Sequence, residues 1–460
     1  MFCLTQLMCI PCSPGIVFPR ISGADFSSSQ DSGGYMRKGI VFLLALLMPV
    51  SGVLASGFNI YEFGGKASAM SGAVVGRYWD GSTIFYNPAG LGFSQGTQFY
   101  GGTTLIFPTA KFVGASPIFS NTTYNAVENI FTPIGVYLSH KFDDNFAAGI
   151  GVTNPFGLGV EWSDDFPGRA ISQNAVLESF YITPVLAYKI APNFSISGGL
   201  DIVIARVNLQ RAANMFDSPG SPGYEIGEVE LSGTSRTAIG FNFSAMYQSE
   251  KLGFGFMYRH SVTADFRDSD ADFTIYDNLS VPNAAAIAKF VLFDQKANAS
   301  LNFPNYFALG LYYKLTEKFG AEVDYVWFGW SQFDQITLDF QGNDALDQEI
   351  PFNYSDSWQL RVGTHYDLND KLTLRAGYSY DVTPQPIESV SPLLPDNTRN
   401  NVSFGASYAF GNYTVDAGYM LVNIGERSTV EDGVGKNHYG FNGTYTSKAD
   451  LFFLSFGIKF

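Results

Sequence analysis

The last nine residues of the chain alternate between two kinds of side chain. Large apolar residues occupy every second position, and mostly smaller or more polar residues lie between them: Phe452, Leu454, Phe456, Ile458 and Phe460 against Phe453, Ser455, Gly457 and Lys459. Successive side chains of a β-strand point to opposite faces, so this pattern predicts a strand with one apolar face.

The same alternation recurs along the chain and predicts fourteen strands: 97–107, 129–142, 145–160, 177–190, 193–210, 234–248, 251–267, 300–315, 319–333, 356–369, 371–384, 400–410, 413–427 and 443–460. The second face of these strands is mostly Gly, Ser, Ala and Asn, which are small enough to line a lumen. The connections alternate between six short turns and seven long loops, which is the layout of an outer-membrane barrel with periplasmic turns and outer loops. We therefore predict an all-β fold, a 14-stranded antiparallel transmembrane β-barrel.

Composition agrees with a barrel but does not decide the class by itself. Only 15% of the residues are charged, 16% are aromatic and 48 are glycine, which is typical either of a sticky soluble β protein or of a barrel that faces lipid. The net charge of −15 argues against a nucleic-acid partner, because such a partner needs a basic face.

The N-terminal region decides between these two classes. Met36-Arg37-Lys38 precedes an apolar run over 39–48, and Val53-Leu54-Ala55 follows it as a small-residue cleavage site. This is the anatomy of a secretory signal peptide over 36–55, while the alternative, a membrane anchor, would need a run of about 20 residues. Residues 1–35 are then expected to be a mis-assigned upstream extension, and they hold all three cysteines. We predict export to the bacterial outer membrane.

Segment 56–96 separates the cleavage site from the first strand. It is rich in small residues and contains "DGSTIFYNPAGLG", whose Asn87, Pro88, Ala89 and Gly90 favour a turn over a strand. A fourteen-stranded barrel is wider than side chains alone can fill, so we expect this segment to plug the barrel formed by 97–460. Its glycines are expected to make the plug mobile.

Several motifs in order along the chain resemble the FadL family of outer-membrane transporters for long-chain fatty acids and other hydrophobic compounds. They are Gly57-Phe58, Glu62-Phe63, Asn87-Pro88-Ala89, Trp330-Ser331-Gln332-Phe333, the stretch 374–381 with Thr383-Pro384, Pro395-Asp396 with Arg399, and the terminal Phe460. The resemblance implies a barrel plugged by an N-terminal hatch. It also implies capture of an apolar substrate outside and lateral exit through the barrel wall, where the third strand bends inward.

The third predicted strand contains a candidate for that bend at Asn154, Pro155, Phe156 and Gly157. Proline has no N–H to donate to a neighbouring strand, and glycine permits a bend. An interrupted strand is costly in lipid unless its backbone groups face a cavity. The alternative is that Pro155 only ends the strand at the outer rim.

Candidate substrate contacts fall into two groups. Apolar hatch residues are expected to line a ligand pocket or only to anchor the plug, and the substrate-binding candidates among them are Phe58, Ile60 and Phe63. A fatty-acid carboxylate would need a cation, and the candidates are Arg206, Arg211, Arg361 and Arg375. Of these, Arg206 falls on the outward phase of its strand, and each arginine could instead pair with a lumen carboxylate such as Asp201, Glu322, Asp324 or Asp381. The family's fatty-acid members carry a lysine where this chain has Thr337, which leaves hydrocarbons open as substrates.

The alternative function is a general or gated diffusion porin, and an enzyme is the further rival. A general diffusion porin would share the strand count but not the Asn-Pro-Ala turn of the hatch. A lipid hydrolase would need a nucleophile paired with one of the four histidines, and no such pair, metal cluster or nucleotide motif is present. We predict no enzyme activity, no cofactor and no metal. The expected partners are a hydrophobic small molecule, outer-membrane lipid and lipopolysaccharide, with the chain as a monomer. The Ala-rich stretch 282–299 is expected to form a helix, either over the barrel mouth or packed on neighbouring loops.

Overall fold

The computed structural model describes residues 57–115, 122–215, 223–277, 279–280 and 283–460. The predicted upstream extension (1–35) and signal peptide (36–55) lie outside these residues. No helix among the described residues is both long and apolar enough to cross a membrane.

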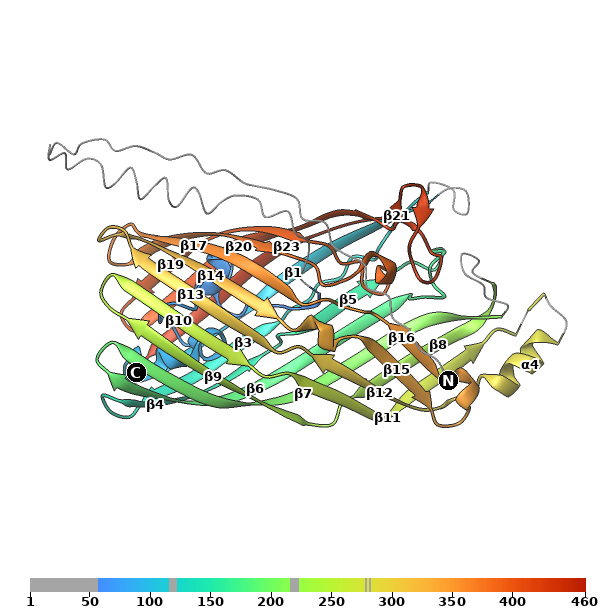
Figure 1. The fold of residues 1–460 in the computed structure, drawn as a ribbon, viewed down its shortest axis with the longest axis horizontal. Helices are drawn as coiled ribbons and strands as arrows, with labels where there is room; N and C mark the ends of the chain where they lie inside the picture. The colour runs from blue at the N-terminus through green and yellow to red at the C-terminus, as the bar shows by residue number, and fades with distance from the viewer. Residues whose placement is uncertain (1–56, 116–121, 216–222, 278, 281–282) are drawn as a thin grey trace, which may run out of the picture. The chain divides into compact units, whose positions relative to one another are not determined.

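Within the described residues, fourteen antiparallel strands form a closed ring (Figure 1). In ring order they are β1 (Thr97–Gly114), β3 (Ile134–Lys141), β4 (Phe146–Thr153), β6 (Asn174–Ala191), β7 (Phe194–Met215), β9 (Ala238–Gln248), β10 (Leu252–Arg259), β13 (Tyr306–Lys314), β14 (Phe319–Phe328), β17 (Ser357–Asp367), β18 (Leu372–Asp381), β19 (Arg399–Phe410), β20 (Tyr413–Ser428) and β23 (Gly443–Lys459). The ring closes between β1 and β23, whose register runs from Gln98 opposite Lys459 to Gly114 opposite Gly443. The predicted fourteen-stranded barrel is confirmed.

Further strands lie at the end that carries the long loops. They are β2 (Thr123–Asn125), β5 (Gly157–Glu161), β8 (Tyr224–Thr234), β11 (Val262–Ile275), β12 (Gln295–Phe303), β15 (Gln335–Phe340), β16 (Gln348–Pro351), β21 (Val430–Glu431) and β22 (Val434–Gly435). Of these, β21 and β22 pair with each other, and the others extend the wall. By the layout of outer-membrane barrels, this long-loop end is extracellular and the short-turn end is periplasmic. The predicted loop helix is α4 (Ala284–Val291), which projects from the long-loop end beyond β8 and β11 (Figure 1).

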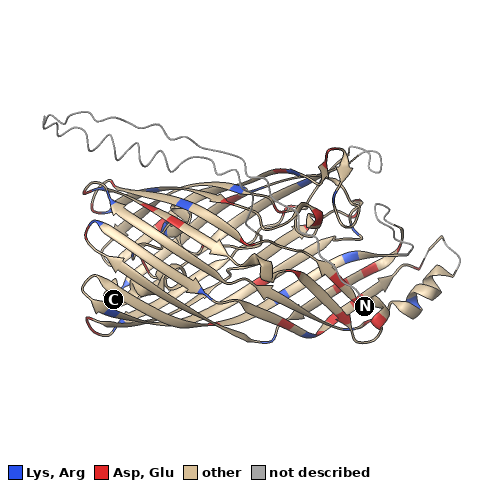
Figure 2. Cartoon of the chain, in the orientation of Figure 1, with Lys and Arg blue, Asp and Glu red and all other residues tan. Residues whose placement is uncertain are grey.

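The outer and inner faces of the wall follow the alternation in the sequence. Residues of the apolar phase are exposed on the outside, as Leu186, Ile239 and Phe404 illustrate, whereas the small and polar residues point inward and are buried. Charged residues are sparse along the middle of the wall and gather toward its two ends, with Asp and Glu prominent near β8 and β11 (Figure 2). An apolar belt between charged ends is the surface that a bilayer requires.

The segment between residue 57 and the first strand packs against the inner wall. It contains two short helices, α2 (Gly65–Ala69) and α3 (Thr83–Tyr86), and the 3₁₀ helix η1 (Pro88–Phe93). Two further 3₁₀ turns, η2 (Trp330–Gln332) and η4 (Ile387–Ser389), lie in barrel connections, as does η3 (Asp344–Leu346). We refer to residues 57–96 as the plug.

Glycines allow the plug and the wall to approach each other closely. A Cβ added at Gly253 or Gly255 would overlap the backbone of plug residues Gly76 and Val75, and one at Gly363 would lie 2.7 Å from Cβ of Met70. Of the plug glycines that we expected to confer mobility, Gly72 has a positive φ of 78°, but Gly76 adopts an ordinary φ and is needed because it lies against the backbone of β13. Close packing explains these glycines better than mobility does.

Candidate functional site

Three cavities follow one another inside the barrel. The mouth cavity, of about 220 Å³, lies at the long-loop end and includes Arg211 and Gln348. The middle cavity, of about 100 Å³, shares Leu209, Leu231 and Phe352 with it. The wall cavity, of about 370 Å³, shares a second set of residues with the middle cavity: Phe58, Leu158, Leu177 and Leu394. The shared lining residues place the three cavities side by side from the long-loop end to the barrel wall.

The chemistry of the lining changes along this series. Among the described residues, no charged side chain lines the middle cavity, whose walls are mainly Leu, Ile, Val, Ala and Phe. The mouth cavity contains Arg211 and Glu349, and the wall cavity contains Glu62, Asp396 and Arg399 on its inner side and the exposed Glu178 and Lys448 on its outer side. An apolar compound can therefore leave water along a route whose central part offers it only apolar contacts.

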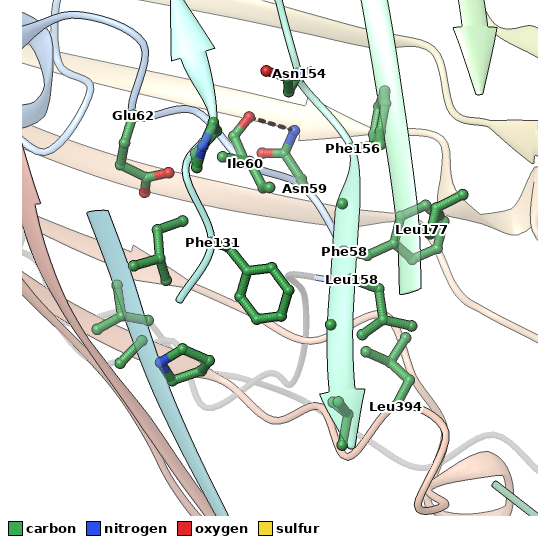
Figure 3. A pocket seen from close by; sticks show the side chains of 18 of the residues that line it. Phe58, Asn59, Ile60, Glu62, Phe131, Asn154, Phe156, Leu158, Leu177 and Leu394 are labelled. Atoms are coloured by element: carbon green, nitrogen blue, oxygen red, sulfur yellow. Dashed lines mark hydrogen bonds between the residues drawn. The ribbon is translucent and has the colours of Figure 1, made fainter. Parts of the chain in front are cut away.

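The wall is interrupted where the third strand was expected to bend. Strand β4 ends at Thr153, and the chain resumes as β5 at Gly157, so Pro155 lies between two strands and not at the end of one. The side chain of Phe156 turns into the barrel, where it is buried and stacks on Phe303 with ring centroids 4.8 Å apart. Figure 3 shows this region with the lining of the wall cavity.

The plug and β6 satisfy the backbone groups of this break. The N–H of Ile60 donates to the carbonyl of Pro155 (2.9 Å), and the N–H of Gly157 donates to the carbonyl of Phe58 (3.0 Å). On the β6 side, the N–H of Phe156 donates to Oγ of Ser179 (2.9 Å). The break therefore leaves these groups paired although β5 has lost one neighbour, which meets the requirement of a lipid environment.

The missing neighbour of β5 leaves a window in the wall. At its outer end the N–H of Val127 donates to the carbonyl of Glu161 (2.8 Å), and at its inner end the N–H of Ile134 donates to Oδ1 of Asn154 (3.0 Å). Between these bonds, no backbone hydrogen bond joins 128–133 to 155–160, all of which are described residues. We call the gap between these two segments the window.

The wall cavity reaches both faces of the barrel at the window. Its inner lining includes Phe58 and Ile60 of the plug, whereas Ile134 and Phe180 belong to the outward phase of β3 and β6. On β6 the neighbours of Phe180 in sequence, Ser179 and Tyr181, are buried and point inward. The wall cavity is thus lined by residues of both faces of the wall, whereas a closed pocket in the lumen would be lined by inward-facing residues alone.

Hydrogen bonds to buried side chains hold the plug in place. Asn87 is buried, and its Nδ2 donates to the carbonyls of Val75 (2.8 Å) and Ala245 (3.2 Å), which ties the Asn-Pro-Ala turn to β9. Asp324 of β14 accepts from the N–H groups of Val74 (2.8 Å) and Val75 (2.9 Å). Asn87, Pro88, Ala89 and Gly90 line none of the three cavities. Their contacts agree with an anchoring role.

Comparison with known proteins identifies the family. Residues 47–460 match the family described as "Outer membrane protein transport protein (OMPP1/FadL/TodX)". This chain belongs to that family. The family consists of transport proteins, so the prediction of a FadL-family transporter of the bacterial outer membrane, and not an enzyme, is confirmed.

Individual relatives of this FadL-family chain include both curated proteins and solved structures. Outer membrane protein P1 of Haemophilus influenzae is 26% identical over 423 residues, covering 82% of this chain and 88% of the relative. The long-chain fatty acid transport protein of Salmonella typhi is 26% identical over 404 residues, covering 82% and 90%. A Pseudomonas aeruginosa FadL homologue has the same fold with a TM-score of 0.76 at 22% identity, covering 88% of this chain and all of that one. The Pseudomonas putida toluene transporter TodX has the same fold with a TM-score of 0.68 at 17% identity, covering 87% of this chain and 99% of that one.

The four candidate arginines of this FadL-family chain occupy different environments. Arg206 is exposed on the outward phase and lies over the ring of Phe180 (5.4 Å). Arg361 is buried, donates to the carbonyl of Gly72 (3.3 Å) and lies 4.1 Å over the Tyr61 ring. Arg375 is buried beside Ser407. Neither Arg361 nor Arg375 lines any of the three cavities, whereas Arg211 lines the mouth cavity and donates to Oε1 of Gln348 (3.1 Å).

The apolar hatch candidates also differ in which cavities they line. Phe58 lines both the middle and the wall cavities and packs edge-on against Trp330 (4.8 Å) and Phe333 (5.2 Å). Ile60 lines the wall cavity. Phe63 lines neither and packs on Phe85 within the plug (4.9 Å).

Sequence reasoning missed two features of the site. Phe131, in the connection before β3, lines the wall cavity (Figure 3), and Leu394, in the connection after β18, lines both the middle and the wall cavities. Leu394 lies in an irregular segment, where no periodic pattern marks a side chain as inward or outward. Phe131 falls within the predicted strand 129–142, but that boundary was wrong, because β3 begins only at Ile134.

Proposed function

We propose that this protein takes up hydrophobic compounds, either long-chain fatty acids or hydrocarbons, across the outer membrane. A compound enters the mouth cavity from outside, moves through the uncharged middle cavity past Phe58, and leaves sideways through the window into the membrane. The plug remains in the lumen and blocks the direct route to the periplasm.

One observation carries this proposal: the cavities share lining residues from the mouth to a break in the wall whose backbone groups are paired elsewhere. Each CH₂ removed from water contributes about 0.8 kcal/mol, so a water-filled pore gives an alkyl chain no favourable route. An apolar path that ends at lipid gives the alkyl chain a favourable route. The plug supports the same route, because its anchors to β9 and β14 keep the axial path closed.

The names of relatives support both substrate classes. One relative is named a long-chain fatty acid transport protein and another structure is a toluene transporter. For a fatty acid, Arg211 is the cation at the mouth that the carboxylate would meet, while the tail would occupy the middle cavity. A hydrocarbon would use the middle cavity alone.

The outer surface supports a monomer embedded in lipid and lipopolysaccharide. The ring of strands closes on itself without a second chain, and large apolar side chains are exposed from β3 to β23. Lipid acyl chains would cover this belt.

The test is to purify the protein without added ligand, extract it and identify bound compounds by mass spectrometry, and to record ion conductance in planar bilayers. We expect a stoichiometric apolar compound and no steady conductance. An empty lumen with a high steady conductance would contradict the proposal and indicate a diffusion porin.

A further inference from the structure

The ring of Phe131 lies in the window. Its backbone is fixed to β1, because its N–H donates to the carbonyl of Ile106 (3.0 Å) and its carbonyl accepts from the N–H of Ile106 (2.8 Å). From this base the side chain crosses toward β5, where the tip of the ring lies so close to Gly159 that a Cβ there would overlap it (Figure 3). Phe131 therefore occupies the gap that hydrogen bonding leaves open.

A second apolar side chain meets the same face of β5, because residues two apart in a strand share a face. A Cβ at Gly157 would lie 2.7 Å from Cδ1 of Ile60, which belongs to the plug. The two glycines of β5 thus each receive one side chain on that face, Ile60 from the plug and Phe131 from the connection before β3. Neither glycine has a positive φ, so close approach and not backbone conformation explains their presence.

Phe131 differs from the buried aromatic residues around it in how it is held. Phe156 and Phe303 stack on each other inside the main apolar cluster, whereas Phe131 is only half-buried and belongs to none of the clusters of buried apolar side chains among the described residues. Its neighbour Ile130 is 60% exposed. A half-buried ring on a fixed backbone can change rotamer without moving a strand, on the nanosecond scale of surface side chains.

We propose that the ring of Phe131 partly blocks the window and thereby limits the cross-section of the compounds that leave through it. We call this ring the shutter. The inference rests on the proposed lateral exit and adds a residue that determines specificity. With the ring on Gly159, the window admits a thin, flexible chain, and a wide rigid molecule must displace the ring. Because Gly159 has no side chain, the ring can rest in the wall instead of projecting into lipid.

Two substitutions remove the shutter by different means. Phe131→Ala deletes the ring, and Gly159→Ala displaces it without altering it. Cells that lack their own transporter and express each variant are supplied with hexadecanoic acid or with phenanthrene, and uptake of each compound is measured. We expect both variants to raise the ratio of phenanthrene to hexadecanoic acid uptake several-fold, because pocket size discriminates between compounds of different width. In the Phe131→Ala background, Gly159→Ala should add nothing, since both changes act on one contact.

The control is Phe241→Ala, which removes a lipid-facing ring on β9, two strands beyond β6 in the ring order and outside the lining of the wall cavity, and should leave the ratio unchanged. Folding is checked by the shift in gel mobility on heating that intact barrels show. An unchanged ratio in both folded variants, or an equal change for both compounds, would overturn the shutter. Failure of lateral exit itself is recognised separately, because a variant with the break in β4–β5 removed would then keep the uptake of both compounds.

Discussion

Replacing Asp324 with alanine tests whether wall carboxylates hold the plug in the lumen. The buried Asp324 carboxylate accepts hydrogen bonds from the N–H groups of Val74 (2.8 Å) and Val75 (2.9 Å). Alanine would leave both buried N–H groups without this acceptor, and each such loss costs about 1–3 kcal/mol. The docked plug therefore loses roughly 2–6 kcal/mol, which shifts its equilibrium with an undocked state by at least about 30-fold.

The assay for this change is steady ion conductance in planar bilayers, together with protease cleavage within residues 57–96. Both should increase in Asp324→Ala and increase less in Asp324→Asn, because the amide keeps one acceptor oxygen. Asp370→Ala, which removes an exposed carboxylate from a short turn, should match the unmodified protein. The barrel should persist, because the β13–β14–β17 ladder is made of backbone groups. Conductance and protease protection at the unmodified level in Asp324→Ala would refute the anchoring role.

Two other substitutions address the plug. Gly255→Val should raise conductance, because a Cβ at this position overlaps the Val75 backbone, which cannot rotate away. Gly198→Val should not, because a Cβ at Gly198 would lie 4.0 Å from the Asn242 carbonyl oxygen, an ordinary contact. Burial raises the pKa of Glu62 above that of a free glutamate although Arg399 and Arg361 oppose it. For a group whose pKa is raised by folding, the linked stability is present at a pH below the pKa of the group in the unfolded chain. It is lost as the pH rises through the pKa of the group in the folded protein. Glu62→Gln should therefore raise the thermal midpoint at neutral pH but not in acid; equal gains at both would contradict this.

The barrel could be predicted from sequence because one rule acts on every strand. Lipid outside and small residues inside impose a period of two, which is visible in stretches such as 371–384 without knowledge of any partner. The interruption at Pro155 was also predictable, since proline cannot join a sheet ladder on both sides. The predicted strand 145–160 also covered most of β5, but that β5 forms a ladder with β6 and not with β3 could not be predicted, because it depends on contacts between distant parts of the chain.

The anchors and the path depend on contacts between distant parts of the chain. The inward phase placed Asp324 in the lumen, but its partners are backbone N–H groups about 250 positions earlier, which no local pattern reveals. The role of the β10 glycines could not be predicted either. In the sequence, a glycine that lets the plug backbone approach looks the same as a glycine that only lines the lumen. Arg361 and Arg375 were candidates for substrate on phase alone, and both contact plug residues instead, through Tyr61 and Trp79.

The central claim is that compounds leave through the window in the wall. The most direct measurement is uptake of radiolabelled hexadecanoic acid and of a hydrocarbon by cells that express Pro155→Val with Gly157→Val, which favours a continuous strand from β4 to β5. Pro184→Val with Gly198→Val makes the same exchanges in unbroken strands and is the control. We predict a folded barrel that has lost uptake of both compounds, with normal uptake in the control. Unchanged uptake in the folded Pro155→Val, Gly157→Val protein would contradict the account.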